Sequence, residues 1–109
     1  MDKSLKYSQI LTQVLRTETT IQPRLQNIKI RAVCDSESGQ FLIIATGWDK
    51  KGWINTILFH ARLADGKVVI EDDNFEEGLT ETLIKAGIPA EDIVSGLSQE
   101  QFFSTTQKN

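Results

Sequence analysis

The side chains best placed to do chemistry lie in one acidic segment. Five carboxylates stand within seven positions: Glu71, Asp72, Asp73, Glu76 and Glu77. Hard cations bind several oxygens that converge on one point, but this spacing matches no EF-hand loop, and no histidine or cysteine lies nearby in the sequence. Helix capping and compensation of a helix dipole explain Asp73, Glu76 and Glu77 without a metal. We therefore expect this segment to bind neither a metal nor a cofactor.

The chain has a single histidine, His60, and a single cysteine, Cys34. His60 falls among apolar residues of a predicted strand, and the chain contains neither a G-x-S-x-G motif nor a glycine-rich phosphate-binding loop. Cys34 also falls in a predicted strand, where no helix N-terminus with basic neighbours would lower its pKa. We predict no catalytic residue. An enzyme that uses His60 with Glu71 or Asp72 ranks third among our hypotheses, and it requires these groups to share one pocket.

Aromatic side chains are the other candidates for binding. Trp48 and Trp53 flank a polar break, and Phe102 and Phe103 interrupt a polar tail. Aromatic residues are enriched at protein interfaces, whereas tryptophans beside a hairpin turn also clamp the turn by packing across it. Both interpretations stay open. The candidate partner-binding residues are Trp48, Trp53, Asp72, Asp73, Glu76 and Glu77.

Length and composition predict an ordinary globular domain. The chain has 109 residues, of which 39% are hydrophobic and 25% are charged, and this is enough to bury one core without metals or disulfides. We expect one domain over residues 1–97, followed by a polar tail at 98–109. A single cysteine fits a reducing compartment. With no signal peptide and no apolar run near 20 residues, we expect a cytoplasmic protein that does not enter a membrane.

Charge is distributed unevenly along the chain. Residues 1–67 carry ten Lys and Arg against six Asp and Glu, and residues 68–109 carry two against nine, which sums to the net charge of −3. An acidic protein without a basic run is a poor candidate for sequence-independent DNA binding, because such binding depends on neutralising phosphates. A basic patch assembled by the fold from the scattered N-terminal cations stays open as an alternative.

Residues 3–20 are predicted to form a helix. Its apolar stripe recurs at helical spacing, with Ser8 expected off the stripe and Tyr7 beside it. Pro23 makes a stop before Ile21 or Gln22 the expected end. The stripe consists of Leu5, Ile10, Leu11, Val14 and Leu15.

The next two elements are predicted strands. Period-two alternation from Asn27 to Asp35 leaves one face polar, which places this strand at or near a sheet edge. Residues 41–48 are apolar on both faces, as in a central strand covered by helices, and Gly47 indicates a bulge.

A polar break at residues 49–52 is the strongest hairpin signal in the chain, because apolar runs flank it and Gly52 can take a positive φ. It joins the strand that ends at Trp48 to a return strand over 53–63, with Trp48 and Trp53 facing each other across the loop ends. A second turn at residues 64–67 leads to a short strand over 68–71.

The C-terminal part is predicted to be helical. A second helix is expected near residues 75–85, capped by Asp73 or Asn74 and ended by Gly87, with Glu76 and Glu77 in its first turn. Pro89 opens a short helical turn over 89–92, and Ile93, Val94 and Leu97 are expected to dock on the body. The fold class is therefore α+β: an N-terminal helix, a four-stranded antiparallel meander, one C-terminal helix and a short helical turn.

Several of these motifs, in this order, resemble the XisI family of cyanobacterial excision-controlling factors, named for excision of the fdxN element. The resemblance runs from the N-terminal helix to about Leu97. The tail from Ser95 departs from it, because family members continue with a His-Pro-x-x-Arg-like stretch. The motifs are Gly47-Trp48-Asp49, Gly52-Trp53, the segment HARLADGKVVIEDDNFEEGL at 60–79 and AGIPAEDIV at 86–94.

The resemblance implies a small α+β domain that acts beside a recombinase and a second factor, XisH, in a programmed DNA rearrangement of heterocyst differentiation. It implies no catalytic residue. Our leading hypothesis is a non-enzymatic accessory factor that binds an XisH-like protein, because an acidic C-terminal half suits a basic partner. Direct DNA binding as an excision-directionality factor, through the N-terminal basic residues, is the alternative. A homodimer through a sheet edge or the tryptophan region is left open.

Overall fold

A single sheet with helices packed on one face forms the frame of the protein, in a computed structural model that describes residues 3–21 and 27–96. Leu97, Phe102, Phe103 and the tail at 98–109 lie outside the described residues. The elements are α1 (Lys3–Glu18), β1 (Asn27–Asp35), β2 (Gln40–Asp49), β3 (Gly52–Ala64), β4 (Lys67–Asp73), α2 (Thr80–Ala86), the 3-10 turn η1 (Ala90–Asp92) and β5 (Ile93–Ser95).

The sheet has the strand order β1-β2-β3-β4-β5. The first four strands form the predicted antiparallel meander, with β1 at the sheet edge as expected. A fifth strand was missed: Ile93 and Val94 do not merely dock but pair in parallel with Val68 and Val69 of β4. A three-residue segment is too short for side-chain alternation to reveal a strand. Its parallel pairing with β4 also depends on the crossover through α2, which returns the chain to the sheet beside β4.

The core lies between α1, α2 and one face of the sheet. Tyr7 and Ser8 are buried, whereas Leu5 is 60% exposed, so the buried stripe of α1 is rotated from the predicted one toward Tyr7. The reason is that α1 packs over the sheet on one side and against α2 on the other, and a sequence stripe does not show which flank is covered. The core residues are Tyr7, Leu11, Val14, Leu15, Phe41, Ile43, Phe59, Ala61, Val68, Leu79, Leu83 and Ile88.

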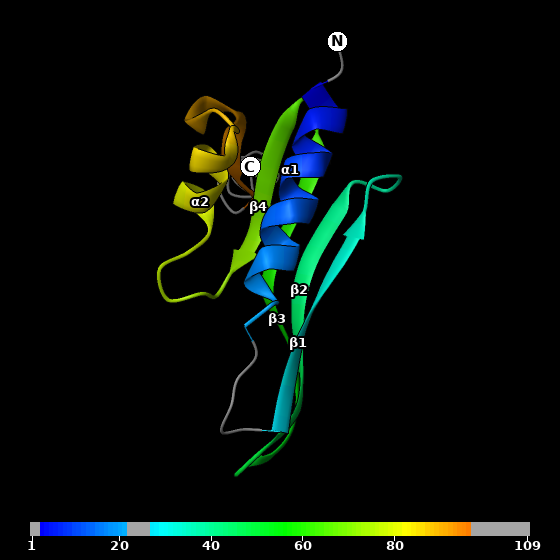
Figure 1. Ribbon diagram of the computed structural model, residues 1–109, viewed down its shortest axis with the longest axis vertical. Coiled ribbons are helices and arrows are strands. Elements are labelled where there is room, and N and C mark those ends of the chain that lie inside the picture. Colours follow the sequence, from blue (N-terminus) through cyan, green and yellow to red (C-terminus); the bar gives the residue numbers. More distant parts are fainter. Residues whose placement is uncertain (1–2, 22–26, 97–109) are drawn as a thin grey trace, which may run out of the picture.

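Burial in β2 alternates, with Phe41 and Ile43 buried and Leu42 and Ile44 only half-buried. The prediction that helices cover both faces of this strand is therefore wrong for the described helices, which pack on one face. Figure 1 shows α1 lying over that face, while β1, β2 and β3 continue past the C-terminal end of α1 as a long ribbon. Within the described residues, no helix is long and apolar enough to cross a membrane.

The predicted bulge at Gly47 is also wrong, since the register shifts lie elsewhere, between Ile43 and Ile44 in the β2–β3 pairing and between His60 and Ala61 in the β3–β4 pairing. Gly47 is instead required by the close approach of two strands. Its φ is 149°, and a Cβ atom there would lie 2.0 Å from the carbonyl oxygen of Asn27. Glycine is required because β1 approaches β2 too closely for any side chain at this position.

The second helix begins later than predicted, at Thr80, and ends at Gly87 as expected. Glu76 and Glu77 consequently lie in the preceding loop and not in a first helical turn. The carboxylate of Asp73 shapes this loop by accepting backbone hydrogen bonds from Phe75 at 3.3 Å and Leu79 at 2.9 Å. Carboxylates compete for backbone N–H groups outside helices, and here that competition replaces the helical turn the sequence predicts. The 3-10 turn after Pro89 is confirmed.

Candidate functional site

The two tryptophans form a pair near the free end of the ribbon. Trp48 and Trp53 are register partners, as predicted. Their ring centroids are 5.4 Å apart and their planes meet at 71°, an edge-to-face arrangement that aromatic pairs favour. They are nevertheless 58% and 59% exposed. The pair therefore clamps the hairpin and also leaves most of its aromatic surface free for contact.

The turn beyond the pair is held by Asp49. Its Oδ1 atom accepts the backbone N–H groups of Lys51 at 2.8 Å and Gly52 at 3.1 Å, and Gly52 takes a φ of 127°. Lys50 and Lys51 are exposed at the tip. The Asp49 carboxylate is thus engaged by backbone donors, while both lysines extend into solvent.

Two more cations share the tryptophan face. In the β1–β2 register Trp48 lies opposite Asn27, Thr46 opposite Lys29 and Ile44 opposite Arg31. Alternate residues of a strand share a face, so Lys29 and Arg31 project on the side that carries the tryptophans. We call residues 27–31 and 45–56 the hairpin arm.

A second feature, the acidic hollow, lies where the end of α1 meets α2 and the loop before it. Four glutamates line it, and Lys85 is the cation among its lining residues. The predicted acidic set is therefore divided, because Glu76 and Glu77 reach this hollow whereas Asp72 and Asp73 stay in β4. The residues that line it are Glu18, Phe75, Glu76, Glu77, Gly78, Leu79, Glu81, Thr82 and Lys85.

Sequence reasoning missed two members of the acidic hollow, Glu18 and Glu81. Glu18 is the last residue of α1 and Glu81 lies in the first turn of α2, so the packing of the two helices brings them to the loop. Within residues 3–21 and 27–96, no group of three or more His, Cys, Asp or Glu side chains is arranged to hold a metal ion. The hollow is an acidic surface without a metal-ligand geometry.

His60, Glu71 and Asp72 come to neighbouring strands, and His60 is the register partner of Asp72. The side chains of His60 and Glu71 already have partners. The Nε2 atom of His60 lies 2.7 Å from Oε1 of Gln40, and Nε of Arg62 donates to Oε2 of Glu71 at 2.5 Å. None of the three residues lines the acidic hollow or the groove along α1. The arrangement is a row of cross-strand polar pairs.

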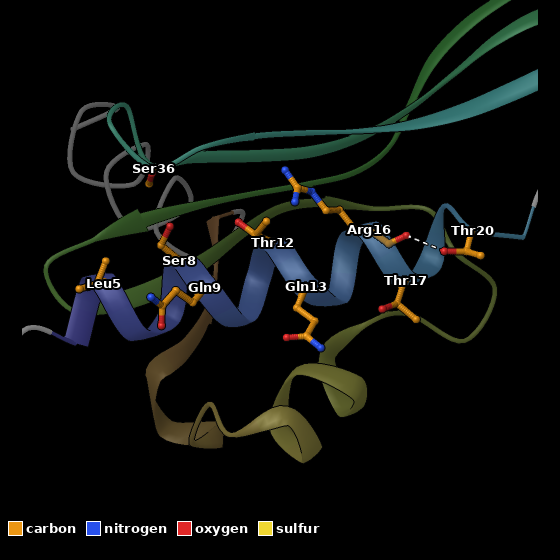
Figure 2. Close-up of a pocket in the computed structure, with 9 residues that line it drawn as sticks. All are labelled: Leu5, Ser8, Gln9, Thr12, Gln13, Arg16, Thr17, Thr20 and Ser36. Carbon is orange, nitrogen blue, oxygen red and sulfur yellow. Dashed lines mark hydrogen bonds between the residues drawn. The ribbon is translucent and has the colours of Figure 1, made fainter.

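An open groove of about 640 Å³ runs along α1 (Figure 2). Hydroxyl and amide side chains dominate it, and Arg16 is the charged residue among those that line it. Thr20 turns back on the helix, its Oγ1 donating to the carbonyl oxygen of Arg16 at 3.1 Å. The groove offers hydrogen bonds but no reactive group. Its lining residues are Leu5, Ser8, Gln9, Thr12, Gln13, Arg16, Thr17, Thr20 and Ser36.

Cys34 lies on the half-buried side of β1. Burial raises the pKa of its thiol, an effect that a hydrogen bond with Thr12 and the charge of Arg16 oppose. The raised pKa keeps the thiol protonated at neutral pH.

Tyr7 and Asp92 form a buried polar contact that the sequence does not signal. The Tyr7 hydroxyl donates to Oδ2 of Asp92, and the ammonium groups of Lys3 and Lys67 lie 3.5 and 3.6 Å from the Asp92 carboxylate. This hydrogen bond is the main cause that raises the pKa of Tyr7 to about 12 and lowers the pKa of Asp92, with burial opposing the latter shift. The contact ties α1 to η1 and so helps to hold the frame together.

Comparison with known proteins places this fold in a defined group. The sequence profile of the family described as XisI protein matches residues 1–107, which includes most of the tail at 98–109. A crystal structure of a XisI-like protein from Anabaena variabilis ATCC 29413 is similar with a TM-score of 0.78 at 24% identity, over 86% of each chain. The crystal structure of fdxN element excision controlling factor XisI from the same organism has a TM-score of 0.72 at 26% identity, over 88% of this chain and 87% of that one. Among curated proteins, none matches this chain.

Proposed function

The chain belongs to the XisI family, and from this premise we propose that it is a non-catalytic accessory factor that controls excision of a DNA element. It acts by binding a second protein of the recombination machinery, an XisH-like partner. Support comes from the similar fdxN element excision controlling factor of Anabaena variabilis. In this proposal the partner docks on the acidic hollow.

The observation that carries the proposal is the meeting of four glutamates from three separate segments. Glu18 ends α1, Glu76 and Glu77 lie in the loop, and Glu81 belongs to α2. Side chains of like charge that lie close together repel one another. A cluster of negative charge attracts a cationic partner. A basic protein surface fits this requirement.

The charges of the acidic hollow are expected to accelerate association and to select the partner more than to increase the affinity of the complex. Glu76, Glu77 and Glu81 are exposed, and exposed charge pairs contribute little each, about 0–1 kcal/mol. Their summed field attracts an oppositely charged partner and accelerates its association, an effect that added salt screens. We therefore expect binding that weakens clearly as ionic strength rises.

The non-catalytic part of the proposal rests on the pairing of two of the three side chains that a third hypothesis assigned to catalysis. His60 contacts Gln40, and Glu71 is held by Arg62. A general base must reach a substrate proton and a nucleophile needs an adjacent base, whereas these groups are occupied by neighbours on the sheet. This arrangement supports a binding role over hydrolysis.

The test measures binding of the XisH-like protein from the same source by biolayer interferometry at 50 and 200 mM salt. The double variant Glu76→Lys with Glu77→Lys reverses two charges of the acidic hollow, and we expect it to lower affinity roughly tenfold at the lower salt. The control, Glu37→Lys with Glu91→Lys, makes the same change in net charge at exposed positions outside the hollow.

Equal loss in both double variants would show that net charge and not the acidic hollow governs binding. Failure of the unmodified protein to bind the XisH-like protein at either salt concentration would remove the partner assignment itself. The two results are distinguishable because the first still gives a measurable complex.

A further inference from the structure

The hairpin arm carries positive charge in an acidic protein. Its cations are Lys29, Arg31, Lys50 and Lys51, and its one carboxylate is that of Asp49. The arm is therefore +3 in a chain whose net charge is −3. Because Asp49 accepts two backbone N–H groups within the turn, its charge is partly compensated locally. Such a surface favours an anionic ligand.

The same surface presents two exposed indole rings. The edge-to-face contact of Trp48 and Trp53 uses the edge of one ring and part of the face of the other, and more than half of each side chain stays exposed. Ile57 and Val33, at 37% and 44% exposure, lie further along the same face, beyond the polar row of Lys29, Thr46 and Asn55. A ligand that fits must offer flat apolar surfaces as well as negative charge.

We propose that the hairpin arm binds single-stranded nucleic acid, with bases stacked on Trp48 and Trp53 and phosphates held by Lys29, Arg31, Lys50 and Lys51. Proteins bind single strands by combining a cationic track with aromatic side chains on which successive bases stack. A duplex keeps its bases stacked on one another and offers them no exposed face. An acidic protein surface would supply the negative charge, but it would not supply flat rings to stack on the two indoles.

The dimensions of the arm suit a short run of nucleotides. Five strand steps separate Ile44, opposite Arg31, from Asp49 beside the tip, a length of about 17 Å at about 3.4 Å per residue. The cations stand on the edge strand and at the tip, with the tryptophans between the two. A single-stranded nucleic acid that lies along the arm therefore contacts cations on either side of the aromatic pair.

This site lies apart from the acidic hollow and goes beyond the proposed function. The hollow is built by α1, α2 and the loop before α2, whereas the hairpin arm extends past the end of α1 (Figure 1). None of the arm's cations or tryptophans lines the hollow. A partner protein on the hollow and a single strand on the arm are compatible, and each can be tested alone.

The chain supplies its own probe, because Trp48 and Trp53 are its two tryptophans and both stand in the arm. The experiment titrates the full chain with a 20-nucleotide oligothymidylate and follows tryptophan fluorescence at 50, 100 and 200 mM salt. We expect quenching on binding. Four phosphate contacts give a slope of log K against log salt of about −2.8, which is roughly a 50-fold loss of affinity over this range.

The decisive variant is Lys50→Glu with Lys51→Glu. We expect the salt slope to fall to about −1.4, since two phosphate contacts remain, together with a loss of affinity of at least roughly tenfold. The matched control, Lys6→Glu with Arg16→Glu, makes the same charge change at exposed positions outside both the arm and the acidic hollow and should keep the original slope. Trp53→Ala should weaken binding roughly 5- to 150-fold, the effect of losing one stacked base.

Four outcomes overturn the proposal. The first is the absence of quenching at 50 mM salt, and the second is an equal loss of affinity in the arm variant and its control. The third is equal binding of duplex DNA of the same length, which would make stacking unnecessary. The fourth is equal quenching by a polyglutamate peptide, which would assign the arm to an acidic protein. All four leave the XisH-like binding experiment on the acidic hollow unaffected.

Discussion

The hydroxyl of Tyr7 donates a hydrogen bond to the carboxylate of Asp92 from 85 positions away along the chain. Tyr7 stands in the second turn of α1, and Asp92 ends η1 just before β5. Lys3 and Lys67 flank the same carboxylate, so one buried charge connects α1, β4 and the C-terminal crossover. A buried carboxylate with several donors is stable only while the donors remain in place.

Removal of either partner should destabilise the fold. We expect Tyr7→Phe and Asp92→Asn each to lower the urea midpoint, and the double variant to cost less than the sum of the two because the residues share one interaction. Chemical denaturation followed by circular dichroism measures all four proteins. Strict additivity would mean that the contact contributes nothing of its own.

The same contact predicts a pH dependence of stability at both ends of the scale. The folded-state pKa of Asp92 is lowered, so its contribution is present above pH 3.8, the ordinary value, and is lost as pH falls through the lowered pKa. The pKa of Tyr7 is raised from 10.0 to about 12. Its contribution is therefore full below pH 10 and disappears as pH rises through about 12.

Urea denaturation of the unmodified protein and of Tyr7→Phe between pH 8 and pH 12 tests the alkaline limb. The stability difference between them should shrink above pH 10, and the Asp92→Asn difference should shrink below pH 3.8. A difference that stays constant through either window would contradict the corresponding pKa shift.

Gly47 should tolerate no side chain. Gly47→Ala places a Cβ atom 2.0 Å from the carbonyl oxygen of Asn27, so β1 must move away from β2, and we expect a loss of about 3 kcal/mol or more. Gly52→Ala is the matched control, because Gly52 has a φ of 127° in the same hairpin and no atom within 4 Å of the added carbon. Its cost should be about 1–2 kcal/mol. Equal costs would show that backbone conformation alone, and not the close approach, requires glycine.

Asp73 should control the loop that supplies the acidic hollow. Asp73→Ala removes the acceptor for the N–H groups of Phe75 and Leu79, and we expect a cost of about 1 kcal/mol. Amide hydrogen exchange in residues 74–79 should accelerate, because the loop loses the side-chain acceptor that holds its backbone. Asp73→Asn keeps one acceptor oxygen and should lose less protection; if it loses as much as Asp73→Ala, the negative charge and not the hydrogen bonds orders the loop.

The sequence by itself determined the features that depend on neighbouring residues. Alternation from Asn27 to Asp35 correctly indicated an edge strand, and the polar break before Trp53 indicated the hairpin, because side-chain alternation and turn preference are local properties of the chain. Gly87 and Pro89 likewise marked the end of α2 and the start of η1. The family resemblance also came from motif order alone, and the profile match supports it.

Tertiary structure decided everything that depends on which surfaces meet. The rotated stripe of α1, the pairing of β5 with β4 and the close approach at Gly47 all follow from packing between segments distant in sequence. The acidic hollow forms because packing places Glu18 and Glu76 around the same depression. The hairpin arm is cationic because the pairing of β1 with β2 places Lys29 and Arg31 on the same face as Trp48. A residue pattern shows which side of an element is apolar or charged, but the neighbour that covers that side is fixed only when the whole chain packs.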